Sequence, residues 1–342
     1  MRDVRAVLSD PATTVDLLTP KAIARIIAQQ GIMPEKTLAI MQVFGRAHRR
    51  PNDAERLDAI TVTKLLHCAL PGLDLNATLA GLASSKGTTA DTMDAVLRPI
   101  LSTWRAAALG IDADLGQRVE DGLLQVIVAI EQHGLANLAL VEPLANAVTR
   151  DLAELDAKRC KARDMPITHW VSPAFLAILP VAYTGVSMLA HLAEIPDLQE
   201  KLRVRPELRP GYLREVERLM NAFRYGTRQI GPAGLDLGDA WLPPRSLVVL
   251  DFAAANRDPA LWDDPDLCLL DRPRQPTATF SFGPLACVGG QLSRQFLGKL
   301  LDAVLDTARV SLPALGSLPD RRPTKWSIAR GYAMCRLHIS EL

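Results

Sequence analysis

The chain carries the stretch Phe280-Ser281-Phe282-Gly283-Pro284-Leu285-Ala286-Cys287-Val288-Gly289-Gly290. It presents one cysteine in a loop bracketed by glycines, and the apolar periodicity of residues 291–305 predicts a helix directly after it. Glycine lets the backbone turn tightly and approach a flat ligand closely. A thiol where a helix begins lies near the positive end of the helix dipole, which favours the thiolate. The stretch therefore predicts that Cys287 is a ligand-binding thiol.

This loop resembles the haem-binding loop of the cytochrome P450 family. The family pattern has Phe, then Gly three residues later, Cys four residues after that, and Gly two further on; Phe280, Gly283, Cys287 and Gly289 match it. In that family the cysteine thiolate is the axial ligand of haem iron. The resemblance implies haem b as the cofactor and Cys287 as the iron ligand. A buried cysteine beside a turn is the alternative interpretation of the four positions alone.

Further matches lie upstream of the loop in the order that the family has. Glu215 and Arg218 are three residues apart, so they share one face of a helix. The resemblance implies that they form a buried structural triad with Arg272, which would hold the cysteine loop in position and take no part in chemistry. It also implies that Arg228 binds a haem propionate. Solvated surface charges are the alternative interpretation of each of these residues.

The resemblance is strong from Pro196 to the C-terminus, moderate over residues 1–11 and weak between residues 30 and 160. It implies a single domain, mainly α with small β-sheets, that lacks the usual N-terminal helix and part of the first sheet. A substrate pocket would then be more open on that side, or covered by a partner. The expected parts are an N-terminal helical part, a central helix over haem, and a part with the Glu-x-x-Arg helix, the cysteine loop and a C-terminal hairpin, at residues 1–165, 166–195 and 196–342.

Composition excludes several classes of function. The chain has 39 basic and 38 acidic residues, so it shows no charge pattern for binding nucleic acid or an anionic membrane. Aromatic residues make up only 5%, which argues against a platform for stacking bases. The 5 cysteines are an odd number and widely spaced, without a zinc or disulfide pattern. With no apolar leader visible, we expect a cytoplasmic protein.

The segment from Ile167 to Ala193 contains no charged residue and is long enough to span a membrane. It also contains Pro173, Pro180 and several hydroxyl side chains, so a fully buried central helix is the better interpretation. The resemblance implies that this helix crosses the haem face opposite the cysteine.

Most of the remaining chain shows helical periodicity. We expect a loop with a short helix at residues 76–89 and, because the sequence is β-rich and bounded by prolines, a short buried strand at Leu247–Leu250. The alternating tail predicts a closing hairpin near residues 329–339. The expected helices are residues 19–30, 34–47, 54–70, 91–108, 115–132 and 142–162.

Monooxygenases of the family carry an acidic residue followed by Thr in the central helix. Counting back from Ile195-Pro196 places Leu179 and Pro180 at that pair, and neither side chain can donate a proton. Peroxide-using members have Arg-Pro there, so this chain shares only the proline. Thr184 and Ser187 are the hydroxyls nearby, and such residues in helices usually bond back to a carbonyl. We expect the substrate to lie against Leu176, Leu179, Pro180 and Tyr183, with Thr184 a candidate hydroxyl.

Propionate binding also departs from the family. Leu285 stands where the family usually has Arg or His, and the His-x-x-x-Arg of the third helix is replaced by Ala54 and Asp58. His48 and Arg50 are the candidates to compensate, with a basic surface turn as the alternative.

Three functions remain open from the sequence. The first is a haem-thiolate, monooxygenase-like oxidoreductase that acts on a small organic substrate in a bacterial specialised or lipid pathway, with electrons from a ferredoxin and its reductase. Within this class, the absence of the acid–alcohol pair favours an enzyme that uses peroxide or catalyses a non-oxygenative reaction. The second is a haem-poor helper that acts through a partner enzyme. The third is a helical protein unrelated to haem, which would make five ordered matches accidental.

Overall fold

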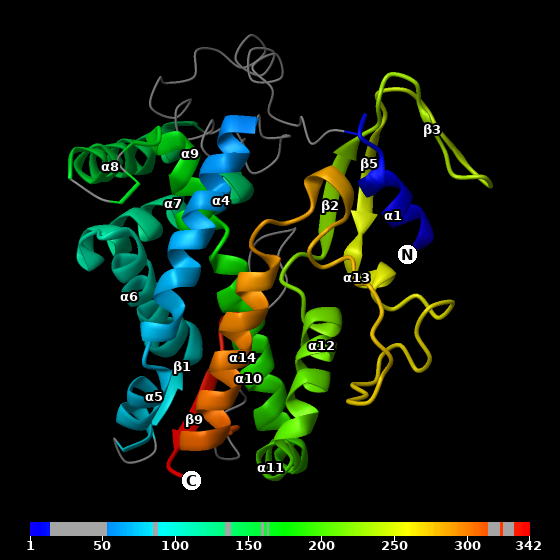
Figure 1. Cartoon of the computed structure of the whole chain (residues 1–342). Helices are drawn as coiled ribbons and strands as arrows, with labels where there is room; N and C mark the ends of the chain where they lie inside the picture. The colour runs from blue at the N-terminus through cyan, green and yellow to red at the C-terminus, as the bar shows by residue number, and fades with distance from the viewer. Residues whose placement is uncertain are drawn as a thin grey trace.

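The computed structural model describes residues 1–13, 53–84, 88–133, 138–158, 161–162, 164–313, 322–323 and 332–342. Within these residues the chain is mainly helical with four small antiparallel sheets, which confirms the predicted class (Figure 1). The helices are α1 Arg2–Ser9, α4 Asp53–Ala69, α5 Leu75–Ser84, α6 Arg98–Leu109, α7 Ala113–His133, α8 Leu138–Ala157, α9 Ile167–Val171, α10 Leu179–Glu194, α11 Pro196–Val204, α12 Arg209–Leu219, α13 Phe252–Ala255 and α14 Gly290–Thr307.

The sheets join segments far apart in the sequence. The largest has the order β1-β9-β6, so the C-terminal strand pairs with strands from both halves of the chain. The three other sheets pair β2 with β5, β3 with β4, and β7 with β8. The strands are β1 Thr88–Asp91, β2 Tyr225–Gln229, β3 Leu235–Asp236, β4 Trp241–Leu242, β5 Leu247–Asp251, β6 Arg309–Ser311, β7 Arg322–Pro323, β8 Tyr332–Met334 and β9 Arg336–Ser340.

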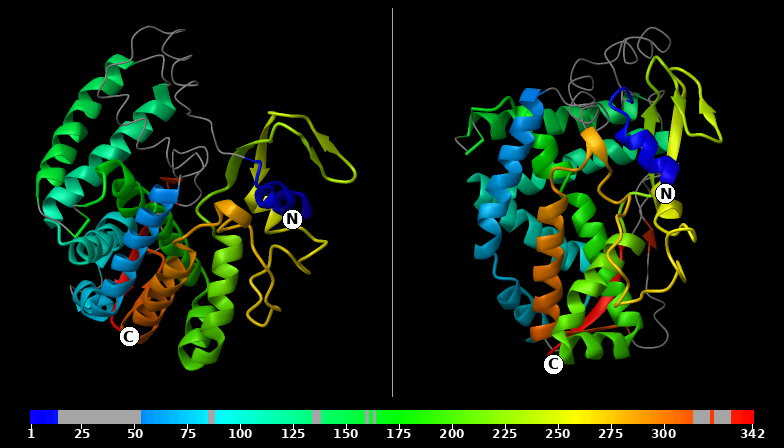
Figure 2. Two further views of the ribbon diagram at one scale, coloured as in Figure 1. Left: turned by 45° about the horizontal axis from the view of Figure 1, so that its top comes forward. Right: turned by 45° about the vertical axis from the view of Figure 1, so that its right-hand side comes forward.

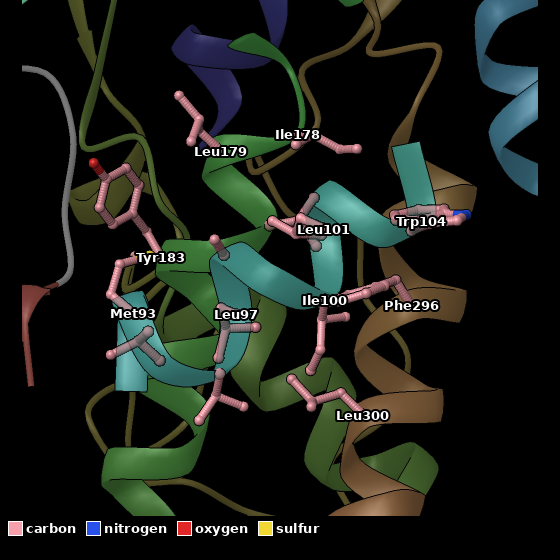
Figure 3. Close-up of a cluster of buried hydrophobic side chains, with 14 of the residues drawn as sticks. Met93, Leu97, Ile100, Leu101, Trp104, Ile178, Leu179, Tyr183, Phe296 and Leu300 are labelled. Carbon is pink, nitrogen blue, oxygen red and sulfur yellow. The ribbon is translucent and has the colours of Figure 1, made fainter. Parts of the chain in front are cut away.

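The large core surrounds α10, which lies between α14 and the residues that lead into α6 (Figure 3). Trp104 and Phe296 stack here with ring centroids 5.2 Å apart. Gly185 of α10 permits the close approach, because a Cβ at this position would lie 3.1 Å from Leu97 and 3.2 Å from Leu300. Close packing of this kind makes α10 the rigid centre of the helical part.

A second, smaller core lies where α1 packs on the β2–β5 sheet (Figure 2). The loop that contains Cys287 follows the second core in the sequence and ends at α14, which packs in the large core. It therefore connects the two cores (Figures 1 and 2). The members of the second core are Val7, Leu8, Ile230, Leu250, Phe252, Ala255 and Ala278.

The central segment differs from the continuous helix that we predicted. It consists of α9, a π-helical turn at Ser172–Leu176, a short turn and then α10. Pro180 is therefore in the first turn of a new helix, where its missing N–H costs nothing, and does not kink a longer one. The stretch Ile167–Glu194 passes a length and hydropathy test for a membrane span, but 72% of its most apolar window is buried inside the protein. Burial of this extent is that of a core segment.

Three further predictions were wrong in part. The closing hairpin expected near residues 329–339 is not formed by its two strands pairing with each other, because β8 pairs with β7 and β9 pairs with β1 and β6. The short helix expected within residues 76–89 is the ten-residue helix α5, because Leu75, Leu79 and Ala83 recur on one face and are buried, and the end of that stretch begins strand β1 and not a loop. The strand at β5 exists but is buried on one face only: Leu250 is 6% exposed and packs in the core with α1, whereas Leu247 and Val249 on the other face are 56% and 62% exposed. The helices expected at residues 19–30 and 34–47 lie outside the described residues.

Candidate functional site

Cys287 lies in a loop that closes on itself. Its N–H donates to the carbonyl of Phe280 at 2.8 Å, and the N–H of Ala286 donates to Gly283 at 3.1 Å. Cys287 is exposed, and α14 begins three residues later at Gly290. The loop therefore places an exposed thiol three residues before the beginning of a helix.

The surroundings of the thiol act on its pKa in opposite directions. Partial desolvation raises the pKa of the Cys287 thiol. Hydrogen bonds from the backbone N–H groups of Gly289 and Gly290 and the positive charge of Arg294 lower the pKa in part. Without a metal ion the thiol therefore keeps its proton at neutral pH, and a bound metal ion would remove that proton.

Gly283 lets α1 contact the cysteine loop. Its φ is +64°, and a Cβ there would lie 2.8 Å from the carbonyl oxygen of Leu8 and 2.8 Å from the Cα of Ser9. The guanidinium of Arg5 lies 5.6 Å from the centre of the Phe282 ring. Helix α1 thus supports the loop from outside, and only glycine fits at the contact.

The structure brings Glu215, Arg218 and Arg272 together in a buried cluster. Arg218 donates to both carboxylate oxygens of Glu215, at 2.9 and 2.7 Å, and Nε of Arg272 lies 3.4 Å from the same carboxylate. The ring of Trp262 lies 5.0 Å from the guanidinium of Arg218 and 5.9 Å from that of Arg272. The remaining N–H groups of the two arginines donate to backbone carbonyls of Asn256, Asp263, Asp264, Pro265 and Leu267.

This cluster is satisfied within the protein. Each charged group of the cluster has a partner. The buried cluster therefore stabilises the fold only while all three side chains are present. It braces the segment before the cysteine and holds no group free for chemistry.

Asn256 connects that cluster to the cysteine loop, a role that the sequence did not reveal. Its side chain is fully buried; the amide donates to the Arg218 carbonyl at 3.2 Å and to the Thr279 hydroxyl at 3.0 Å. Its Oδ1 accepts the N–H of Ala278 at 2.7 Å. The one local signal in the sequence is the position of this polar residue directly after the small apolar residues Ala253, Ala254 and Ala255.

Glu217 and Arg294 form an ion pair near the cysteine loop that the sequence did not reveal. The carboxylate of Glu217 accepts bonds from Arg294 at 2.6 and 3.0 Å and from the Thr277 hydroxyl at 2.6 Å. The Glu217 carbonyl accepts the Thr279 hydroxyl at 2.7 Å. The guanidinium of Arg294 lies 4.6 Å from the centre of the Phe280 ring. Helix α12 therefore holds the chain on both sides of Cys287.

Arg228 is buried on β2 and lacks an acidic partner among the described residues. One N–H donates to the neighbouring carbonyl of Thr227 at 2.8 Å, and its Nε has no hydrogen-bond partner. Burial lowers the pKa of Arg228 to about 10. A buried guanidinium with a free N–H fits a carboxylate ligand, and a haem propionate is such a group.

The other expected propionate contacts are placed differently. His48 lies outside the described residues. Asp58 binds the ring of His169 on α9 at 2.7 Å and so faces another helix. Arg56, which the sequence analysis did not single out, donates to the carbonyl of Pro284 in the cysteine loop at 2.7 Å. The beginning of α4 is thus fastened to the loop by a guanidinium.

The residues expected opposite the cysteine lie in the large core at the beginning of α10. Leu179 is 2% exposed, and Tyr183 and Thr184 are also buried. The Thr184 hydroxyl donates to the carbonyl of Pro180 at 2.9 Å, and the Ser187 hydroxyl donates to that of Tyr183 at 2.9 Å. Both hydroxyl protons therefore bond back to the helix, and no acidic side chain occurs in α10 before its last residue, Glu194.

The sequence is similar to several curated bacterial proteins. Cytochrome P450 105A3 of Streptomyces carbophilus is 26% identical over 204 residues, which are 58% of this chain and 46% of that protein. Cyclomarin C epoxidase CymV of Salinispora arenicola is 28% identical over 224 residues, 61% of this chain and 54% of that protein. The chain thus spans about half the length of the curated relatives it matches. No family model matches the sequence.

The structural similarity extends over nearly the whole chain. The crystal structure of P450BioI, in complex with an acyl carrier protein that carries hexadec-9Z-enoic acid, covers 99% of this chain and is itself covered to 90%. The TM-score is 0.79 at 14% sequence identity, so the likeness is one of fold.

Proposed function

The chain belongs to the cytochrome P450 family and has its fold, and from this premise we propose that it is a haem-thiolate oxidoreductase, monooxygenase-like in its chemistry. Members of the family bind haem through a cysteine thiolate. Cys287 is the residue here that would bind the iron. The substrate would be a small, largely apolar organic molecule of a bacterial specialised or lipid pathway in the cytoplasm.

One observation carries the proposal: an accessible cysteine in a braced glycine loop occurs in the same chain as a buried arginine that has no acidic partner among the described residues. Cys287 offers a sulfur ligand supported by the N–H groups of Gly289 and Gly290. Arg228 offers a free guanidinium N–H to a carboxylate. Haem has both complementary groups, an iron that binds thiolate and propionates that bind arginine.

The residues of the chain would have separate roles in binding haem, supporting the cysteine loop and excluding water. Cys287 would hold the haem iron, and the bound haem would supply the oxygen-activating chemistry. Arg228 would bind a propionate, and this ion pair would offset the free-energy cost of burying the Arg228 charge without an acidic partner. The clusters around Glu215 and Glu217 hold the backbone of the loop, so that Cys287 keeps one orientation. Leu179 and the neighbouring apolar side chains keep water away from the substrate.

Proton delivery would be atypical. Leu179 and Pro180 cannot donate a proton, and the hydroxyls of Thr184 and Ser187 are already bonded to carbonyls. A reaction that consumes hydrogen peroxide, or a non-oxygenative rearrangement, needs no such donor on α10. A ferredoxin and reductase, with water as the proton carrier, form the second route.

A spectroscopic experiment tests the proposal. The purified chain is loaded with haem, reduced and exposed to carbon monoxide; we expect the absorption band that is specific to a thiolate-bound ferrous haem. Cys287→Ala should lose this band, while Cys268→Ala, which changes another thiol, should keep it. The proposal is wrong if the wild type shows no thiolate band or if Cys287→Ala retains it. Turnover with peroxide or with a ferredoxin–reductase pair then separates the two oxidant routes.

A helper that acts through a partner enzyme is the second candidate. It is favoured by the small number of propionate contacts, since Leu285 replaces a basic residue and Arg228 is the one expected propionate contact that lies within the described residues. This function predicts weak haem binding and a stable complex with a biosynthetic enzyme whose activity does not change in Cys287→Ala.

A further inference from the structure

A groove that the proposed function does not use lies between α4, α5 and α6. Its cavity volume is about 690 Å³, which is in the range of pockets that hold small ligands. Helices α4 and α6 lie on the other side of α14 from α1 (Figures 1 and 2). Neither Cys287 nor the residues expected over haem line this groove, so it is a separate site.

The floor of the groove is apolar and held in place from behind. Leu73, Ile100 and Trp104 line it, and all three side chains are buried. The Nε1 of Trp104 donates to the carbonyl of Leu66 at 2.9 Å, and its ring stacks on that of Phe296 in α14 (Figure 3). A preformed apolar surface binds an apolar group without the entropy loss of ordering the protein first.

One end of the groove carries a positive charge. Pro99, Thr103 and Ala107 line the groove at successive turns of α6. Lys161 lies at the Ala107 end, where its Nζ donates to the carbonyl of Ala107 at 3.4 Å. The ammonium group of Lys161 has no acidic partner among the described residues. The exposed hydroxyl side chain of Thr103 lies one turn away, so this end offers two hydrogen-bond donors to a ligand.

The acidic residue on the rim is already engaged. Oδ1 of Asp74 accepts the N–H of Ala77 at 2.9 Å and so caps the beginning of α5. The helix dipole favours a negative charge at that position. The charge of the groove that a ligand can neutralise is therefore that of Lys161.

We propose that this groove binds a small amphipathic carboxylic acid, with its hydrocarbon chain on the apolar floor and its carboxylate at Lys161 and Thr103. An apolar surface with a cation at one end is complementary to such a molecule in both polarity and charge. The wall from Pro99 to Ala107 is about 12 Å long at the rise of an α-helix, so a linear acid of medium length fits along it. The site does not rest on the proposed function, because it needs neither haem nor Cys287.

The exposed thiol of Cys68 lies on the rim of the groove and reports its occupancy. Alkylation of Cys68 in the full chain is followed by mass spectrometry of the peptide that contains it, with and without added haem. Decanoate at ten times its dissociation constant should slow this alkylation about tenfold, since one binding site is then mostly filled. Decanol and decylamine at the same concentration should protect Cys68 less, because neither offers a negative charge to Lys161. No protection by decanoate, or equal protection by all three compounds, would overturn the proposal.

A lysine substitution tests the position of the carboxylate. Lys161→Met should weaken decanoate binding about fivefold, the size of a partly exposed ion pair, and leave decanol binding unchanged. The matched control is Lys158→Met, because Lys158 is also exposed but pairs with Glu154 and does not line the groove. Titration calorimetry measures the dissociation constants. Unchanged decanoate affinity in Lys161→Met, or an equal loss in Lys158→Met, would show that Lys161 does not bind the acid.

Discussion

Glu217 binds Arg294 through both carboxylate oxygens, at 2.6 and 3.0 Å, and this pair joins α12 to α14, the helix that follows Cys287 in the sequence. Glu217 lies between the two family-like residues Glu215 and Arg218 but points its carboxylate to different partners. One helix therefore contacts the segment before the cysteine and the segment after it.

The first prediction concerns this pair. Arg294 is about half exposed, so Glu217→Gln should change the free energy of unfolding by less than about 1 kcal/mol. The haem-loaded variant should nevertheless lose part of its thiolate band in carbon monoxide spectra, because the backbone around Cys287 is released. The charge-exchanged variant Glu217→Lys with Arg294→Glu should regain most of it. Glu200→Gln removes an exposed pair with Arg203 on α11 and serves as the control; an equal loss there would refute a local effect.

The second prediction concerns Arg228. Because its Nε has no partner and burial lowers its pKa to about 10, Arg228→Met should stabilise the haem-free protein by ~1–3 kcal/mol. The same change should weaken haem binding, since a propionate loses its cation. Urea unfolding and haem titration measure the two effects, with Arg224→Met as an exposed control. If Arg228→Met raised the unfolding free energy and also strengthened haem binding, or lowered both, Arg228 would not be a propionate ligand.

The third prediction concerns the Glu215 cluster. Glu215→Ala leaves Arg218 and Arg272 buried without their carboxylate, which should cost ~3–5 kcal/mol of unfolding free energy. Glu207→Ala breaks an exposed pair with Arg205 and should cost less than about 1 kcal/mol. Chemical denaturation of both haem-free variants checks this, and similar values would mean that the cluster does not brace the segment before the cysteine.

The fourth prediction concerns Gly283. An alanine there must keep a φ near +64° and meets Leu8 and Ser9 at 2.8 Å, so Gly283→Ala should cost ~1–3 kcal/mol and loosen α1. Hydrogen exchange of α1 should increase. Gly81→Ala has no atom within 4 Å of its Cβ and lies in a helix, so it should be neutral or stabilising. Unchanged exchange in Gly283→Ala would argue against the contact.

The fifth prediction concerns pH. Burial lowers the pKa of His191, with the Glu194 charge opposing in part, and the ring contacts the Tyr212 hydroxyl at 3.1 Å. The folded state then binds fewer protons than the unfolded chain, so this contribution is complete above the unfolded pKa of about 6.5 and is lost as pH falls below it. His191→Gln should flatten the loss of unfolding free energy between neutral and mildly acidic pH. Parallel pH profiles for the wild type and the variant would contradict this.

Local patterns in the sequence were enough for the class of fold and for the centre of the site. Periodicity marks α4, α7 and α14 because one face of each is apolar, and it does so without reference to neighbours. The spacing of Phe280, Gly283, Cys287 and Gly289 encodes a loop whose shape depends on its own backbone.

Other features depend on contacts between distant segments, which no local pattern records. The partners of Glu217 and Asn256 come from α14 and from residues 277–279, and the break before α10 accommodates packing against α4 and α9. Which face of β5 is buried was likewise decided by α1, more than 230 residues earlier in the chain. A residue's periodicity is a property of its neighbours in sequence, whereas its hydrogen bonds and burial are properties of the neighbours that folding brings to it.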